Sequence, residues 1–283
     1  MPTSVVITGT GCPVPAANRA GPGVLIRTPT FALQFDAGRS TVQRLAGAGL
    51  WPTRLDAVFL THHHSDHVVG LADLVLTRWV MDRNDETTPL PIVAPLGAAS
   101  RFAAQVLEGF GDDIAVRRAH SGRSTAPAVD VVPFTPPVTP TEVWSSADVR
   151  VFAAAVRHEP VEGAVGYRVE TSDGVVAISG DTRVCDEVAA LADGADVLIY
   201  EAMRFEPIAE LPANRRFVLD YHADTRLIGA QARELGVETL VLTHLLPVPE
   251  TEADQDAFAR DIRDAGYEGR VIVANDLDSV VIG

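Results

Sequence analysis

One short segment of the chain is dense in side chains that bind metal ions. Residues 62–67 read His-His-His-Ser-Asp-His, so four of the eight histidines fall within six positions. Imidazole and carboxylate groups suit zinc, and a catalytic zinc site leaves one position open for water. A regular helix or strand cannot turn all of these groups toward one ion, whereas a tight loop at a strand end turns them toward two. The pattern HxHxDH therefore predicts a two-metal site rather than a turn with solvated histidines.

Three further candidate ligands lie far from this motif along the chain. His158, Asp181 and His244 each follow a run of residues that predicts a strand, as His62 does. In α/β sheets, sites are commonly built at the C-terminal ends of strands, where the loops converge. A single His or Asp after a strand is usually structural, but four such placements favour one common site.

The elements that must position these residues are short apolar runs rich in valine and isoleucine. They predict buried strands, because β-branched residues suit a pleated surface and the runs are too short for helices. The predicted strands are 4–8, 23–27, 31–36, 56–61, 149–156, 166–171, 175–179, 196–200, 239–243 and 270–274. The predicted helices are 40–48, 68–81, 184–192, 223–235 and 252–265, with Gly236 and Gly266 as helix stops. Strands followed by helices in both parts of the chain indicate an α/β fold in which helices cover sheets.

Two stretches that contain prolines are predicted to be irregular. Residues 125–141 carry five prolines and read as a connector, and residues 84–95 read as a polar loop. We therefore expect a single domain, 1–283, made of two similar halves at about 1–145 and 146–283.

Composition restricts the partners and the location of the protein. The chain has 23 basic and 38 acidic residues, a formal net charge of −15, which disfavours nucleic acid as a partner. Cys12 and Cys185 are too few for a disulfide scaffold and are expected to pack as small buried groups. Without a signal peptide or an apolar run of about 18 residues, we expect a cytoplasmic protein that makes no membrane contact.

The order of these motifs resembles the metallo-β-lactamase superfamily: HxHxDH, then a histidine, an aspartate and a last histidine, over nearly the whole chain. Within it, the sequence is similar to the branch of ribonuclease Z and arylsulfatase-like phosphodiesterases. The segments that carry this similarity are Gly9-Thr10-Gly11 with Pro13 and Pro15, Phe35-Asp36-Ala37-Gly38, Gly180-Asp181-Thr182, and Glu201-Ala202 with His222.

The resemblance implies a four-layer αββα sandwich with two Zn²⁺ per chain, Mn²⁺ or Fe²⁺ being alternatives, and a hydroxide between them as nucleophile. It implies one zinc on His62, His64 and His158, the other on Asp66, His67 and His244, and Asp181 as the bridge. Asp66 also orients the hydroxide, and His63 is not a ligand. Asp36 is expected to bond a motif histidine or the loop backbone.

The resemblance also implies a Glu–His pair that protonates the departing oxygen. Glu201 follows a predicted strand and His222 precedes a predicted helix. A carboxylate behind an imidazole fixes its tautomer and raises its basicity. We predict that His222 donates the proton and that Glu201 orients it; a helix-start histidine bonded to backbone is the structural alternative.

The interval between His158 and Asp181 bears on the substrate. It reads as a hairpin that turns at Asp173-Gly174, without room for the flexible arm that tRNA-processing members carry there. We therefore expect a zinc-dependent hydrolase of a small phosphodiester or an aryl sulfate or phosphate ester, with Arg78, Trp79, Trp144 and the 84–95 loop shaping its pocket.

Four alternatives remain open. The same metals could serve a lactonase or another carbonyl ester or amide hydrolase, although such chemistry needs no Glu–His pair. A ribonuclease Z-like tRNA 3′ endonuclease is disfavoured by the missing arm. A mono-iron thiol dioxygenase needs one metal, and a non-catalytic binding module would have lost ligands. The expected partner is a small-molecule ester, and a homodimer is expected only from the resemblance.

Overall fold

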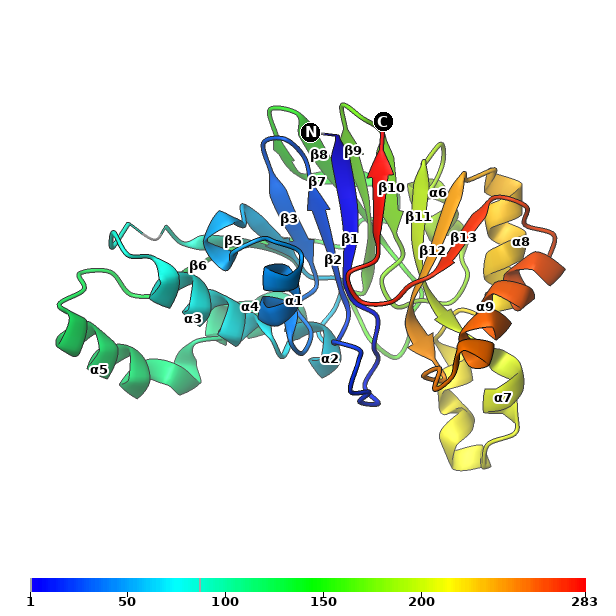
Figure 1. Ribbon diagram of the computed structural model, residues 1–283, viewed down its shortest axis with the longest axis horizontal. Helices are drawn as coiled ribbons and strands as arrows, with labels where there is room; N and C mark the ends of the chain where they lie inside the picture. Colours follow the sequence, from blue (N-terminus) through cyan, green and yellow to red (C-terminus); the bar gives the residue numbers. More distant parts are fainter. Residues whose placement is uncertain (1, 87) are drawn as a thin grey trace.

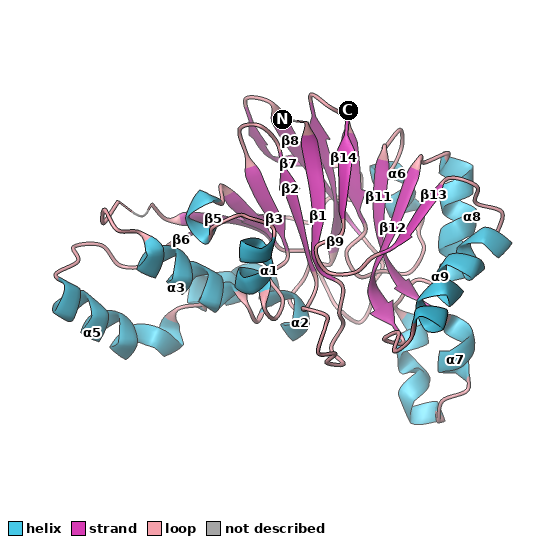
Figure 2. Cartoon of the chain, viewed as in Figure 1, coloured by secondary structure: helices cyan, strands magenta, loops and turns pink. Residues whose placement is uncertain are grey.

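Two seven-stranded sheets lie face to face at the centre of the computed structural model, which describes residues 2–86 and 88–283 (Figures 1 and 2). The first sheet has the order β14 (Ser279–Ile282), β1 (Thr3–Gly9), β2 (Gly23–Arg27), β3 (Ala32–Phe35), β4 (Ala57–Phe59), β5 (Leu90–Pro95) and β6 (Val129–Phe134). The second has the order β13 (Arg270–Val273), β12 (Thr239–Leu246), β11 (Val197–Met203), β10 (Val175–Ile178), β9 (Val165–Thr171), β8 (Val149–Ala155) and β7 (Thr141–Ser146). Because β14 pairs antiparallel with β1, the end of the chain returns to the first sheet.

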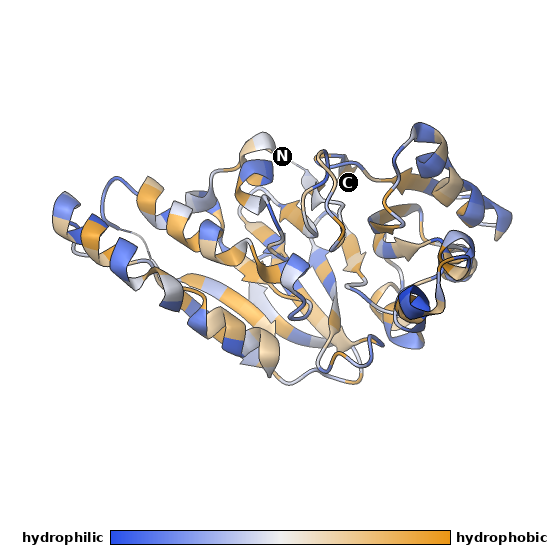
Figure 3. Cartoon of the chain, turned by 90° about the horizontal axis from the view of Figure 1, so that it is seen from below, coloured by the Kyte–Doolittle hydropathy of each residue, from blue (hydrophilic) through white to orange (hydrophobic). Residues whose placement is uncertain are grey.

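Helices cover the outer face of each sheet. Apolar side chains of α1 (Thr41–Gly47), α3 (Leu71–Met81) and α4 (Ala98–Gln105) pack on the first sheet. Those of α6 (Asp186–Leu191), α8 (Thr225–Leu235) and α9 (Glu252–Asp264) pack on the second. Figure 3 shows the apolar strands behind these helices, whose outer turns are hydrophilic. The four-layer αββα sandwich implied by the resemblance is therefore confirmed.

The remaining helical segments lie at the edges of these layers. They are α2 (Ser65–Val68), α5 (Gly111–Ser121), α7 (Phe205–Ala209) and three short 3₁₀ helices, η1 (Pro52–Arg54), η2 (Glu108–Phe110) and η3 (Ala213–Asp220). In Figure 1, α5 projects from one end of the molecule and α7 extends below the second sheet.

The core between the sheets also positions the metal-binding motif. Phe35 and Phe59 stack in this core at 4.8 Å between ring centroids, and Tyr167 of the second sheet contacts both rings edge-on. The Tyr167 hydroxyl donates to the carbonyl oxygen of Leu60 at 2.6 Å, and the Val165 amide donates to the carbonyl of Thr61 at 3.0 Å. Contacts between the two sheets thus hold the backbone that leads into the motif.

All ten predicted strands are present, but the two stretches predicted to be irregular are only partly so. Residues 84–95 contain β5, although residue 87 lies outside the described residues, and residues 125–141 contain β6 and the first residue of β7. Both β6 and β7 are edge strands, and an edge strand tolerates proline such as Pro133 because one side of its backbone needs no ladder partner. Pro133 thus lies within an edge strand, whereas Pro136, Pro137 and Pro140 lie in the connection that leads from β6 in the first sheet to β7 in the second, so this part of the predicted connector is present.

The helix predicted over 68–81 is interrupted. Between α2 and α3, Gly70 lies so close to the backbone of Gly38 that a Cβ on Gly70 would be 2.1 Å from the Gly38 oxygen. The predicted helix stops are confirmed, since Gly236 and Gly266 have left-handed φ values of 65° and 86°. The break at Gly70 separates α2, which carries Asp66 and His67, from α3.

The aromatic residues expected to shape a pocket belong to the core. Trp79 is buried in α3 with the Arg123 guanidinium 5.2 Å over its ring. Trp144 packs edge-on against Phe59. Arg78 is buried and donates to the carbonyl of Thr53. These contacts hold the three residues within the layers, which for Trp79 is the core position that its helical spacing equally favoured, and a role in shaping a substrate pocket stays a prediction.

Both cysteines are buried and free, as expected for small packing groups. Among the described residues, no helix combines the length and the apolar character that crossing a bilayer would require.

Candidate metal centre

The motif histidines emerge where β4 ends at the edge of the first sheet. His62 is buried directly after Thr61, His63 points to solvent, and α2 then places Asp66 and His67 in the buried interior. The loop and the first turn of α2 therefore direct alternate side chains of the motif inward. His63 takes no part in the residue groups described below.

Asp36 holds this loop in place. Its Oδ1 accepts the amide of Thr61 at 2.8 Å, and its Oδ2 accepts the Thr61 hydroxyl at 2.8 Å. The same Oδ2 lies 2.7 Å from Nδ1 of His67. Asp36 itself has a left-handed φ of 55° at the end of β3. With Nδ1 of His67 bonded to Asp36, the other ring nitrogen, Nε2, faces the centre, as expected for a carboxylate that orients a metal-binding histidine.

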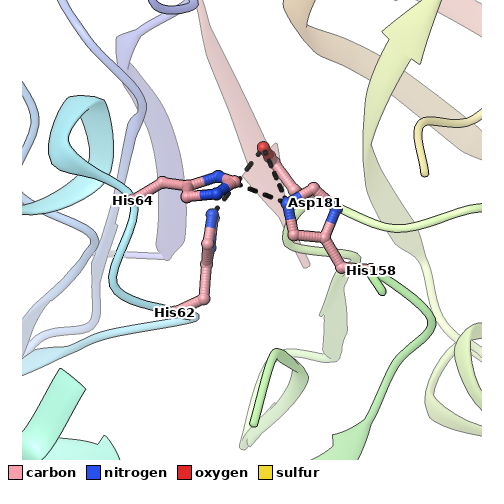
Figure 4. A group of neighbouring side chains, drawn as sticks. All are labelled: His62, His64, His158 and Asp181. Carbon is pink, nitrogen blue, oxygen red and sulfur yellow. Dashed lines mark hydrogen bonds and ion pairs between the residues drawn. The ribbon is translucent and has the colours of Figure 1, made fainter. Parts of the chain in front are cut away.

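One group of side chains converges from both halves of the chain. His62, His64, His158 and Asp181 offer ligand atoms that all lie within 4.8 Å of one another (Figure 4). Nδ1 of His158 donates to the carbonyl oxygen of Tyr221 at 3.0 Å, which turns Nε2 inward to 3.4 Å from Nδ1 of His64. This spacing of two ring nitrogens is consistent with two ligands of one metal ion.

A second group lies beside the first and consists of Asp66, His67 and His244, again within 4.8 Å. His244 has a left-handed φ of 48° within β12, opposite a register shift in the pairing with β11, and this turns its side chain toward the site. Oδ2 of Asp181 lies 3.2 Å from Nε2 of His67, 3.4 Å from Nε2 of His244, and 3.9 and 4.0 Å from Nε2 of His62 and His158. Asp181 therefore occupies the position between the two groups.

The donor set fits metal ions. Nε2 of His62 and Nε2 of His67 are buried, and neither makes a hydrogen bond of good geometry among the described residues, although Oδ2 of Asp181 lies 3.2 Å from Nε2 of His67. Leaving a buried polar atom without a partner costs about 1–3 kcal/mol, and a bound cation would remove that cost. The nitrogen and oxygen donors are also those that zinc accepts. The clusters are consistent with a binuclear site.

Electrostatics support the same interpretation. Burial, together with His158 nearby, lowers the pKa of His64 to about 4, so this imidazole is neutral and able to bind a metal at neutral pH. Burial acts to raise the pKa of Asp181, but His244 and His67 hold that pKa well below its usual range. Burial acts to lower the pKa of His67, whereas Asp181 and Asp36 raise it well above its usual value. These carboxylates thus favour a positive charge at the centre.

Glu201 and His222 form a buried pair next to these groups. Nδ1 of His222 lies 2.9 Å from Oε1 of Glu201, which also accepts the amides of Thr182 and Ala223, each at 3.1 Å. Ligand atoms of His222, Asp181 and His244 lie within 4.8 Å of one another. Since Nδ1 of His222 is bonded to Glu201, the second ring nitrogen of His222, Nε2, is the one directed at the metal centre. Burial acts to lower the pKa of His222, but Glu201 raises it above the ordinary value. A histidine held in this way can donate a proton at neutral pH.

Two functional contacts could not be read from the sequence. The carbonyl of Tyr221 fixes His158 although the two residues are 63 positions apart, and the amide of Thr182 holds Glu201. Both residues adjoin predicted site residues, His222 and Asp181, but adjacency along the chain does not show what a backbone group reaches.

Replacement of Asp36 tests the supporting role of this carboxylate. We expect Asp36→Ala to weaken metal binding by about 10- to 100-fold, because His67 loses the group that orients its ring. The measurement is competition with a fluorescent chelator. His63→Ala, which changes an exposed histidine of the same motif, is the matched control. Equal affinities for Asp36→Ala and the unaltered protein would contradict this role.

Comparison with known proteins agrees with this geometry. The family model "Beta-lactamase superfamily domain" matches residues 29–245. Ribonuclease Z of Mycobacterium bovis (strain BCG / Pasteur 1173P2) is 36% identical over 280 residues, which cover 98% of each chain. The crystal structure of human tRNase Z, short form, has a TM-score of 0.69 at 22% identity and covers 99% of each chain. The Zn²⁺-bound PqqB from Methylobacterium extorquens has a TM-score of 0.66 at 16% identity, covering 99% of this chain and 100% of that chain.

The two solved structures share the αββα fold, and the curated relative shares the sequence over nearly its whole length. The buried histidine and aspartate clusters are those expected of such a hydrolase. The chain is a metal-dependent hydrolase of the metallo-β-lactamase superfamily and, within it, a member of the ribonuclease Z family.

Proposed function

We propose that the protein is a two-metal phosphodiesterase that cleaves RNA, as a ribonuclease Z-type endonuclease at the 3′ side of tRNA. The observation that carries the proposal is the buried Glu201–His222 pair beside the two clusters, in a chain that matches ribonuclease Z over 98% of its length. Cleavage of a phosphodiester that releases a ribose oxygen is strongly aided by a proton donor, whereas carbonyl ester hydrolysis can proceed with metal and water alone.

Within this proposal, His62, His64 and His158 would hold one zinc ion, Asp66, His67 and His244 would hold the other, and Asp181 would serve both. When bound, two close cations lower the pKa of water and neutralise charge on the attacking and leaving oxygens. Zinc is supported by the donor types and by the Zn²⁺-bound structural neighbour.

The residues of the chain then supply orientation and the proton. His222 donates its Nε2 proton to the departing oxygen, while Glu201 holds Nδ1 and stabilises the protonated ring. The amides of Thr182 and Ala223 fix the carboxylate, so the pair is aligned before a substrate enters.

The missing arm argues less strongly against RNA than the sequence alone suggested. The predicted hairpin is present, since β9 and β10 occupy the interval between His158 and Asp181. However, the ribonuclease Z relative matches over 98% of its own length and is therefore about as long as this chain. The relatives thus favour the ribonuclease alternative over the expected small ester, and nothing in them supports an aryl sulfate. A small phosphodiester is the second candidate, favoured by the net charge of −15.

The test compares two substrates of the metal-loaded protein. We expect a tRNA precursor with a 3′ extension to be cleaved at the end of the mature sequence, more efficiently than bis(p-nitrophenyl) phosphate is hydrolysed. Hydrolysis of bis(p-nitrophenyl) phosphate without cleavage of any RNA would leave the small phosphodiester as the substrate. Metal analysis is expected to find two ions per chain, and one iron per chain would favour the dioxygenase alternative.

A further inference from the structure

We propose that Phe217 and Tyr221 form a stacking platform for a nucleobase of single-stranded RNA, and that Arg215 and Arg216 bind the adjacent phosphates. The inference rests on the proposed function, because it adds a binding surface for the RNA at the same site. The segment that carries it runs from α7 through η3 to Tyr221 and extends below the second sheet (Figure 1).

A continuous series of rings leads from this segment into the metal centre. Phe217 lies 6.2 Å from Tyr221, and Tyr221 lies 4.7 Å from His222 and 5.0 Å from His158, between ring centroids. His222 in turn stacks on His244 at 5.4 Å. A nucleobase stacked on Phe217 and Tyr221 would therefore lie next to His222 and His158, which belong to the proposed catalytic site.

The outer end of this series is exposed without an evident structural reason. Phe217 is 57% exposed, although η3 contains no buried residue and does not need the ring for packing. Tyr221 is half-buried beneath it. Aromatic faces that are open to solvent offer stacking energy to any base, and this interaction does not depend on the sequence of the RNA.

Two positive charges lie next to Phe217 in η3, which also carries one acidic residue, Asp220, at its end. Arg215 and Arg216 are both exposed, and within the described chain neither guanidinium forms an ion pair with an acidic side chain. By contrast, the neighbouring Arg204 and Arg226 are paired with Asp261 or Glu206. In a protein of net charge −15, two unpaired guanidinium groups beside an exposed aromatic ring give a local site for phosphates.

The platform is also coupled to the metal centre through the backbone. The carbonyl of Tyr221 accepts from Nδ1 of His158 at 3.0 Å and so sets which ring nitrogen faces inward. A base stacked on Tyr221 therefore rests on the residue that positions a proposed metal ligand. This arrangement would align the scissile phosphate with the centre when the RNA binds.

The test measures RNA binding separately from cleavage. The probe is a fluorescent single-stranded RNA hexamer with phosphorothioate linkages that resist hydrolysis, titrated into the metal-loaded protein by anisotropy. We expect Phe217→Ala to weaken binding by about 5- to 100-fold and Phe217→Trp to restore it. Replacing Arg215 and Arg216 together by alanine is expected to reduce the slope of log affinity against log salt by about 1 to 2.

Matched controls are available near the start of β4, whereas the metal-binding motif follows the end of this strand. Trp51 is 57% exposed, like Phe217, and Arg54 is exposed close to it. Trp51→Ala and Arg54→Ala should bind the hexamer as the unaltered protein does. In cleavage assays, Phe217→Ala should raise KM for RNA more than it lowers kcat, whereas a purely structural role would lower kcat and the melting temperature together.

The outcomes separate this inference from the proposed function. If Phe217→Ala binds RNA with unaltered affinity while the unaltered protein cleaves tRNA precursors, the platform is wrong and the function stands. If binding depends on Phe217 but no RNA is cleaved, the platform stands and the proposed function fails. If the unaltered protein does not bind the hexamer at all, the platform is overturned.

Discussion

Asp181→Ala is expected to abolish hydrolysis, with kcat falling by at least about 1,000-fold, and to reduce the metal content from two ions per chain to one or none. The reason is geometric: Oδ2 of Asp181 lies between both clusters, within 4.0 Å of ring nitrogens from each. No neighbouring carboxylate occupies that position in the described structure, so both ions would lose a shared ligand. The measurements are metal analysis of the purified protein and kcat on bis(p-nitrophenyl) phosphate.

The stability of the metal-loaded protein provides a second measurement. A metal that binds only the folded state raises the melting temperature, so Asp181→Ala should abolish the shift that zinc causes in the unaltered protein. Asp112→Ala changes an exposed aspartate of α5 and serves as the control, with full metal content expected. Two tightly bound ions in Asp181→Ala would show that Asp181 is not the bridge.

His222→Ala is expected to slow turnover according to the leaving group. For RNA, where a ribose oxygen departs and must be protonated, kcat should fall by about 100- to 10,000-fold. For bis(p-nitrophenyl) phosphate, p-nitrophenolate departs without a proton at neutral pH, so the loss should stay below about tenfold. The comparison of the two substrates distinguishes a proton donor from a residue that only supports the metal site.

The partner residue and a control refine this prediction. Glu201→Gln keeps an oxygen near Nδ1 of His222 but removes the charge that raises the pKa of His222, so its effect should have the same leaving-group dependence and be smaller. His120→Ala, an exposed histidine of α5, should leave both rates unaltered. An equal loss on both substrates in His222→Ala would assign His222 to the metal site rather than to proton transfer.

The sequence was sufficient for the features that depend on local chemistry. The density of histidines in residues 62–67 indicated metal binding, and the apolar runs indicated ten strands that the structure contains. Placing His158, Asp181 and His244 after strands indicated that they would meet, because parallel strands end at a common edge. These properties belong to side-chain type and to short-range periodicity, which are visible without any tertiary contact.

The substrate was harder to predict. The short interval between His158 and Asp181 was identified correctly as a hairpin, but the inference from it to a small ester gave too much weight to one absent segment. The relatives named ribonuclease Z are about as long as this chain. A short loop shows only that one RNA-binding segment is absent. Other surfaces that could bind RNA, such as η3 with its exposed Phe217, are visible only in the folded structure.

The sequence alone was thus sufficient to identify the motif and the order of the candidate ligands. The hydrogen bonds that orient these ligands depend on the tertiary structure. Asp36 bonds Nδ1 of His67 and the carbonyl of Tyr221 bonds Nδ1 of His158 across 31 and 63 residues of chain. The strands β5 and β6, whose prolines concealed them, take a near-edge and an edge position that only the completed sheet defines. The physical reason is the same in each case: folding places segments that are far apart in the sequence side by side, as strand pairing does for Asp36 and His67 after β3 and β4, and no local pattern encodes that proximity.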